Sequence, residues 1–131
     1  MERPLVRYLI DTNIWIEATA NVGPAVALLE KAAHAEWAGY SAITRLEAFG
    51  YPSLSPDEEQ ALSTVMGQYR EVAVTPAVID EAIQLRKSRK IRIPDALIAA
   101  TALVMRAVLV TRNEEDFRGL TGVTIENPFR G

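Results

Sequence analysis

The chain contains the stretch Leu5-Val6-Arg7-Tyr8-Leu9-Ile10-Asp11-Thr12-Asn13, in which a nearly apolar run ends at an acidic residue. Such a run predicts a central strand that is covered on both faces, as in a parallel sheet. Ligands bind beyond the carboxyl ends of the strands in open parallel sheets, so Asp11 is a candidate functional residue. It is also a preferred cap residue for a helix that follows the strand.

The rest of the chain alternates between apolar runs and helical patterns. We expect strands near residues 5–11, 36–41, 71–75, 107–111 and 122–126. Helices are predicted to begin at Gly23-Pro24, Ser55-Pro56, Thr75-Pro76 and Pro94, where a proline stands in the first turn. This alternation predicts βα units around a parallel sheet. With 131 residues and no linker or repeat, we expect one α/β domain over residues 1–131.

Composition excludes several classes of function. The chain has no cysteine, which rules out disulfides, thiolate metal sites and cysteine nucleophiles. Its N-terminus lacks the apolar core of a secretory signal, and its longest apolar run, Ala96 to Val104, is shorter than a membrane span. We therefore expect a cytoplasmic protein without a membrane partner. A net charge of −3 argues against a protein that coats nucleic acid with a uniform positive field.

Glu47 stands in an unexpected place for an acid. On a helix it shares an arc with Ile43, Leu46 and Gly50, which predicts that its carboxylate faces the core. Glutamate is almost never fully buried without a partner or a ligand. The alternative is a partly exposed glutamate that accepts a hydrogen bond from a neighbouring backbone amide.

Two further acids follow later in the chain. Asp95 comes directly after Pro94, in the first turn of a predicted helix, where an acid also complements the helix dipole. Asp116 ends Asn113-Glu114-Glu115-Asp116, which is also typical of a capped acidic helix start. Either Glu114 or Glu115 is an alternative to Asp116 as the acid that points inward.

The basic residues are unevenly distributed. Arg86, Lys87, Arg89, Lys90 and Arg92 lie within seven residues directly before Pro94-Asp95. They are either a solvated helix end or a rim that contacts phosphates beside an acidic pocket. The single histidine, His34, lies far from every acidic motif and is predicted to be a surface or helix-end residue.

Four stretches, taken in order, resemble the PIN-domain family of metal-dependent ribonucleases, and most closely its VapC-type toxins. They are Leu9-Ile10-Asp11-Thr12-Asn13, Ser41-Ala42-Ile43-Thr44-Arg45-Leu46-Glu47, Pro94-Asp95-Ala96-Leu97-Ile98-Ala99-Ala100-Thr101-Ala102 and Leu109-Val110-Thr111-Arg112-Asn113-Glu114-Glu115-Asp116-Phe117. Together they cover the chain from near its start to Phe117. The chain departs from the family upstream of Asp95, where Lys90-Ile91-Arg92-Ile93 replaces a glycine-containing loop.

The resemblance implies a three-layer α/β/α sandwich around a parallel sheet of four or five strands. It implies that the four acids bind metal and catalyse RNA hydrolysis, leaving 5′-phosphate and 3′-hydroxyl ends. The acids are Asp11, Glu47, Asp95 and Asp116, and the supporting polar residues are Thr12, Asn13, Thr44, Thr111 and Asn113. It also implies a cognate antitoxin as a partner, as the toxin of a toxin–antitoxin pair, and a homodimer.

The residue types agree with this chemistry. Oxygen ligands without histidine or cysteine select a hard cation, Mg²⁺ or Mn²⁺. A bound cation of this kind lowers the pKa of a water for in-line attack on a phosphodiester. The basic residues expected to contact RNA phosphates are Arg45, Lys90, Arg92 and Arg112.

Other readings remain open. A PIN-like fold that binds RNA or protein without turnover fits the same residues. An aspartyl-phosphate enzyme is disfavoured because Asn13 stands where that chemistry needs a second acid. No G-x-G-x-x-G motif is present for a dinucleotide. Bulky residues flank the site and form either a partner surface or core: Trp15, Ile16, Phe49, Tyr51 and Leu54.

Overall fold

A computed structural model describes residues 5–130 of the chain. Its centre is a five-stranded parallel sheet in the order β3-β2-β1-β4-β5. The strands are β1 (Arg7–Ile10), β2 (Trp37–Ser41), β3 (Arg70–Val72), β4 (Val108–Val110) and β5 (Ile125–Glu126). The parallel sheet predicted from the sequence is confirmed, although β3 begins one residue earlier and β5 is shorter than expected.

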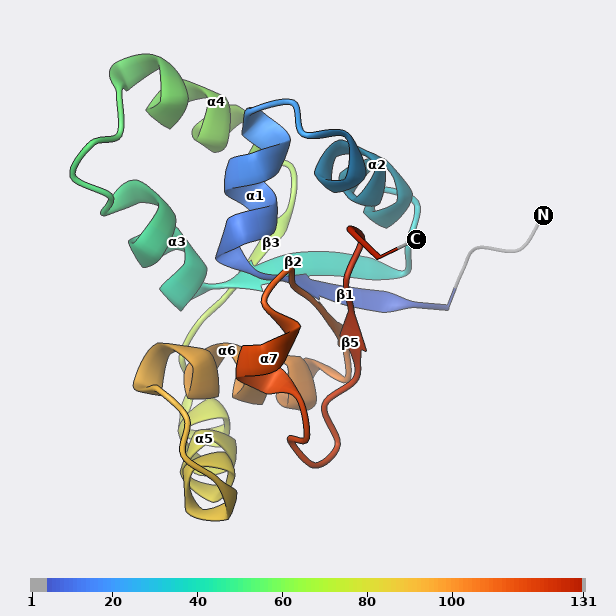
Figure 1. The fold of residues 1–131 in the computed structure, drawn as a ribbon, viewed down its shortest axis with the longest axis vertical. Coiled ribbons are helices and arrows are strands. Elements are labelled where there is room, and N and C mark those ends of the chain that lie inside the picture. The colour runs from blue at the N-terminus through green and yellow to red at the C-terminus, as the bar shows by residue number, and fades with distance from the viewer. Residues whose placement is uncertain (1–4, 131) are drawn as a thin grey trace.

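Helices cover both faces of this sheet. The first four are α1 (Thr12–Thr19), α2 (Gly23–Ala32), α3 (Ala42–Phe49) and α4 (Pro56–Met66). The other three are α5 (Pro76–Ser88), α6 (Ile93–Met105) and α7 (Glu114–Phe117). Figure 1 shows α1, α2 and α4 above the sheet and α5, α6 and α7 below it. The predicted three-layer α/β/α sandwich is therefore confirmed.

Strand β1 explains why both layers form. Its side chains alternate between the two faces of the sheet. Tyr8 and Ile10 enter a core with α1, α2 and α4, whereas Leu9 enters a second core with α5 and α6. Leu9 and Ile10 are completely buried. A strand that must be apolar on both faces gives the continuous run seen in the sequence.

Trp15 anchors the upper core. Its indole N–H donates a hydrogen bond to the Ile10 carbonyl oxygen at 3.0 Å. Its ring meets Tyr40 and Tyr69 edge to face, with ring centroids 5.5 Å and 5.0 Å apart. These contacts hold α1 against the end of β1. They therefore also hold the turn between β1 and α1, which contains Asp11.

The helix starts follow the predicted cap chemistry. The Ser55 hydroxyl and the Glu58 carboxylate form a capping box on α4, and Thr75 caps α5. Asp11 is the cap residue of α1, so the predicted capping role of this acid is confirmed. No described helix is long and apolar enough to cross a membrane.

Candidate acidic active site

Parallel pairing brings the ends of the three central strands to one edge of the sheet. The carboxyl ends of β1, β2 and β4 lead directly into α1, α3 and the loop before α7. Asp11, Ser41 and Thr111 therefore stand in neighbouring positions although they are far apart in the sequence. This is the edge at which ligands bind in open parallel sheets.

Asp11 is the buried centre of this edge, with 6% of its surface exposed. One carboxylate oxygen accepts the Thr12 backbone N–H at 2.8 Å. The other accepts the Thr111 hydroxyl at 2.8 Å and the Asn13 side-chain amide at 3.3 Å. Three of the five predicted supporting residues thus contact this carboxylate directly.

The charge on Asp11 is nevertheless unfavourable. Burial raises the pKa of Asp11 from 3.8 to about 6, although the hydrogen bonds from Thr111 and Thr12 oppose that rise. The neighbouring carboxylates of Glu47 and Asp95 raise the same pKa further. A buried acid with an elevated pKa and like-charged neighbours is typical of a functional site.

Glu47 is half-buried and faces Asp11 from α3. Its carboxylate accepts the Thr12 hydroxyl at 2.7 Å, and that hydroxyl lies 3.2 Å from the hydroxyl of buried Thr44. The partner is therefore a side chain from another element and not a neighbouring backbone amide. The predicted core arc was wrong for Leu46 and Gly50, because Leu46 is 69% exposed and Gly50 is also on the surface.

Asp95 approaches from the other layer of the sandwich, in the first turn of α6. Burial raises its pKa, the guanidinium of Arg92 at 3.6 Å opposes the rise, and the carboxylates of Asp116 and Glu47 add to it. The influence of both acids on Asp95 shows that three different helices present like charges to one region. An acid that only complemented the dipole of α6 would have no other carboxylates close enough to raise its pKa.

The structure distinguishes the three acids of α7. Glu114 is turned away, because its carboxylate accepts the Asn127 amide at 3.0 Å and pairs with Arg130 at 2.6 Å. Glu115 is exposed and pairs with Arg118. Asp116 is the α7 acid whose charge acts on Asp95. Among the three alternatives, Asp116 is therefore the one that joins the acidic cluster.

The basic residues lie in different settings. Arg45 pairs with Glu71, and Arg112 pairs with Glu17 at 2.9 Å. The exposed side chain of Arg92 lies beside Asp95, and Lys90 is exposed. Arg89 donates hydrogen bonds to the carbonyl oxygens of Arg118 and Asp116, which fastens α7 to the end of α5.

Sequence reasoning missed Glu17 and Asn127, and for Arg89 of the basic run it did not predict the contact with α7. Glu17 stands four residues after Asn13 on α1, so both face the same way and both contact Arg112. That spacing is a signal in the sequence. The contacts of Arg89 and Asn127 join segments 13 or more residues apart, and no local pattern marks them. His34 is exposed after the end of α2, as predicted.

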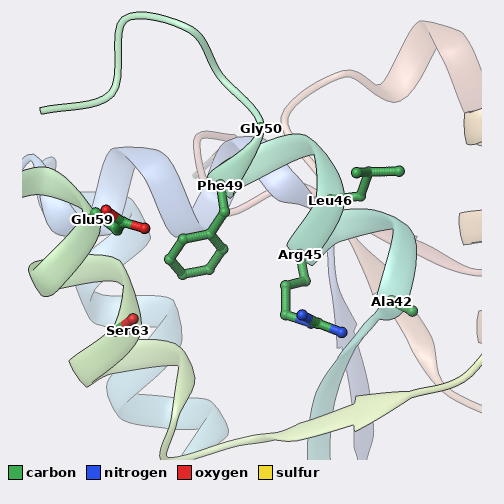
Figure 2. A pocket seen from close by; sticks show the side chains of 7 residues that line it. All are labelled: Ala42, Arg45, Leu46, Phe49, Gly50, Glu59 and Ser63. Atoms are coloured by element: carbon green, nitrogen blue, oxygen red, sulfur yellow. The ribbon is translucent and has the colours of Figure 1, made fainter. Parts of the chain in front are cut away.

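Two open grooves border α4, and none of the four acids Asp11, Glu47, Asp95 and Asp116 lines either of them. One, of about 620 Å³, runs between α3 and α4, where Arg45, Phe49 and Glu59 line it (Figure 2). In this view Phe49 points toward α4 and Leu46 points away from it. The second, of about 640 Å³, is more apolar and lies between α1 and α4. Ile16, Tyr51, Leu54 and Leu62 line it, with Asp57 and Glu58 at its rim.

The carboxylates do not already form a chelate. Within residues 5–130, no three acidic or histidine side chains are arranged to hold one metal ion. Asp11, Glu47 and Asp95 instead point to hydroxyl, amide or guanidinium partners. The donor set still fits a hard cation, since it consists of carboxylate oxygens, and since burial and the neighbouring carboxylates raise the pKa of both Asp11 and Asp95.

An α/β/α sandwich with a carboxylate cluster beyond its central strands defines the class of the molecule. The family model of the PIN domain matches residues 8–122, and the chain therefore belongs to the PIN-domain family. No curated protein matches the sequence.

Solved structures agree with this assignment. A toxin–antitoxin complex from Klebsiella pneumoniae is 30% identical over 92% of this chain and 97% of that one, with a TM-score of 0.78. VapBC2 from Rickettsia felis, bound to a DNA fragment from its promoter, is 25% identical over 93% and 98% of the two chains, with a TM-score of 0.81. The resemblance to VapC-type proteins is confirmed.

Proposed function

We propose that the chain is a Mg²⁺- or Mn²⁺-dependent endoribonuclease and the toxin of a toxin–antitoxin pair. One observation carries the proposal: Asp11, between β1 and α1, and acids of α3, α6 and α7 act on one another electrostatically at the ligand-binding edge of the sheet. Structural likeness to toxin–antitoxin complexes supports the biological role.

In this proposal, Asp11 and Asp95 are the main ligands of the cation. When bound, the cation supplies a water of lowered pKa and neutralises charge on the phosphate. Thr111 and Asn13 hold the Asp11 carboxylate in place, and Thr12 holds Glu47 where it orients the attacking water. Asp116 completes the acidic rim beside Asp95.

The antitoxin is proposed to dock in the groove between α1 and α4. Ile16 and Tyr51 are 43% and 59% exposed there, whereas Trp15 is completely buried and belongs to the core. The acidic rim of Asp57 and Glu58 favours a partner with an apolar face and basic side chains. Hydrogen exchange in the complex should slow on α1 and α4, and protection confined to α5 would contradict this site.

A homodimer is proposed as well. Ile79 and Ile83 are exposed one helical turn apart on α5, on the opposite layer from the groove. Sedimentation of the isolated chain tests this proposal, and a monomer at micromolar concentration would refute it.

The decisive experiment is cleavage of an RNA panel by the wild type and by Asp11→Asn and Asp95→Asn. The wild type should need Mg²⁺ or Mn²⁺ and should stop when a chelator is added, and both variants should fall to background. Glu115→Gln is the matched control, since it also removes a negative charge, but from an exposed acid paired with Arg118. An active Asp11→Asn enzyme would refute the mechanism. No cleavage by folded, metal-binding wild type would favour an RNA- or protein-binding module without turnover.

A further inference from the structure

The segment that follows β5 lies against the loop between β4 and α7. The Asn127 side-chain amide donates to the Glu114 carboxylate at 3.0 Å and lies 3.4 Å from the Arg112 carbonyl oxygen. Its own amide oxygen accepts the Phe129 backbone N–H at 2.9 Å. Asn127 therefore uses both ends of its side chain, one to hold the loop and one to fix its own turn.

Within the loop between β4 and α7, Arg112 is the residue that the segment after β5 contacts with both Asn127 and Phe129. Its guanidinium lies 4.2 Å from the centre of the Phe129 ring and pairs with Glu17 of α1 at 2.9 Å. Its backbone N–H donates to the Asn13 side chain at 3.2 Å. The loop is thus held between α1 on one side and the C-terminal segment on the other.

This loop carries groups of the acidic site at both of its ends. At its start, the Thr111 hydroxyl donates to Asp11 at 2.8 Å and also accepts the Asn113 backbone N–H at 3.0 Å. At its end, α7 begins with Glu114 and carries Asp116 two residues later. A shift of the loop would therefore move the hydrogen bond to Asp11 and the acid beside Asp95 together.

We propose that Asn127 is a positioning residue of the acidic site, which acts through Arg112 and Glu114 to hold Thr111 and Asp116 in place. This inference rests on the proposed nuclease function. Asn127 touches neither a predicted metal ligand nor any of the predicted RNA contacts except Arg112, which it meets at the backbone carbonyl. Its substitution should therefore change the rate of the chemical step more than the binding of RNA.

The control must disturb the same C-terminal segment without loosening the loop. Lys31 of α2 pairs with Glu126 of β5 at 2.9 Å, one residue before Asn127. Lys31→Ala removes a tether of β5 and leaves the Asn127, Glu114 and Arg112 contacts in place. A role of Asn127 in merely stabilising the C-terminus predicts similar effects for both variants.

The experiment compares wild type, Asn127→Ala, Glu114→Ala, the double variant and Lys31→Ala in kcat, KM and thermal stability. We expect kcat to fall about 10-fold in Asn127→Ala, at a KM close to that of the wild type, because small displacements of reacting groups lower rates steeply. The double variant should lose less activity than the product of the two single effects, since the two residues share the Asn127–Glu114 hydrogen bond. Lys31→Ala should retain the wild-type kcat.

Amide hydrogen exchange of Arg112 and Asn113, whose N–H groups donate to side chains of Asn13 and Thr111, provides a second measurement that needs no activity. Exchange should be faster in Asn127→Ala and unchanged in Lys31→Ala. Wild-type kcat in Asn127→Ala, or an equal fall of kcat in Lys31→Ala, would overturn the proposal. If the wild type cleaves no RNA, the proposed function fails. Exchange still decides whether Asn127 holds the loop: unchanged rates refute that role and faster rates support it.

Discussion

Asp11 directly follows β1 and caps α1, so one carboxylate serves both the fold and the site. As a cap residue it accepts the Thr12 N–H, and as a buried acid it needs the Thr111 hydroxyl and the Asn13 amide. These hydrogen bonds do not compensate for burial, and the pKa of Asp11 stays at about 6. The ionised form is therefore destabilised in the metal-free protein at neutral pH.

This shift predicts the effect of Asp11→Asn on stability. The folded-state pKa lies above the ordinary value of 3.8, so the contribution of Asp11 to stability is fully present below pH 3.8. This contribution is lost as the pH rises through about 6. The loss amounts to at most about 3 kcal/mol by pH 7.5. The asparagine side chain carries no charge, so the variant should be more stable than the wild type at pH 7.5 in chelator, with little difference near pH 4.

Urea unfolding at both pH values measures this effect. The gain in the free energy of unfolding should be smaller than about 3 kcal/mol, the upper limit given above. The substitution replaces one carboxylate oxygen by an NH2 group, which cannot accept the hydrogen bonds from Thr111 and Asn13. Glu30→Gln on the exposed face of α2 is the control for loss of one negative charge. A wild type that is more stable than Asp11→Asn at pH 7.5 in chelator would contradict the elevated pKa.

At the scale of elements, the strand ends were the predictable part of the molecule. An apolar run such as Val6 to Ile10 encodes burial on both faces of a sheet, and prolines and serines mark helix starts in the local sequence. The edge of the sheet that carries Asp11 follows from these two signals. Periodicity alone was insufficient for α3, where Leu46 is exposed beside half-buried Glu47, because a short helix at the sheet edge covers little of the core.

The assignment within α7 required tertiary contacts. Glu114, Glu115 and Asp116 are chemically similar and adjacent, so the sequence left all three open. The partners that separate them are Asn127 and Arg130 for Glu114, and Arg118 for Glu115. The Glu115–Arg118 pair is local, three residues apart, whereas the partners of Glu114 come from the segment after β5, and no periodic pattern in the sequence predicts that contact.

The segment between α5 and α6 carries the next prediction, which concerns RNA binding. Arg89 is bound to α7 and Arg92 lies beside Asp95, so Lys90 is the exposed base of this segment that is best placed to reach a phosphate. Lys90→Ala should weaken RNA binding and reduce the slope of log affinity against log salt by about 0.7, the value for one phosphate of a single strand.

Binding should be measured in the Asp11→Asn background, so that the RNA stays intact. Lys31→Ala is the matched control, because Lys31 lies on α2 and is paired with Glu126. An unchanged salt dependence in the Lys90 variant would show that the basic run is a solvated helix end.

At the scale of the whole molecule, the acidic edge joins the two layers of the sandwich. Asp11 stands directly before α1 of the upper layer, Glu47 lies on α3, and Asp95 lies on α6 of the lower layer. Burial, and to a smaller extent repulsion from the neighbouring carboxylates, disfavours the charged forms of Asp11 and Asp95 and so destabilises the folded protein. A cation that binds them should stabilise the entire fold.

Thermal unfolding in increasing Mn²⁺ tests this linkage. A ligand that binds only the folded state adds about 2.7 kcal/mol at 100 times its Kd, so the wild-type Tm should rise with Mn²⁺ concentration. The rise should be larger at pH 7.5 than at pH 5, because a cation must displace a proton from Asp11, whose pKa is about 6. Asp95→Asn should lose most of the rise and Glu115→Gln should keep it. A Tm that rises equally in Asp95→Asn would place the cation elsewhere on the molecule and would separate the acidic edge from metal binding.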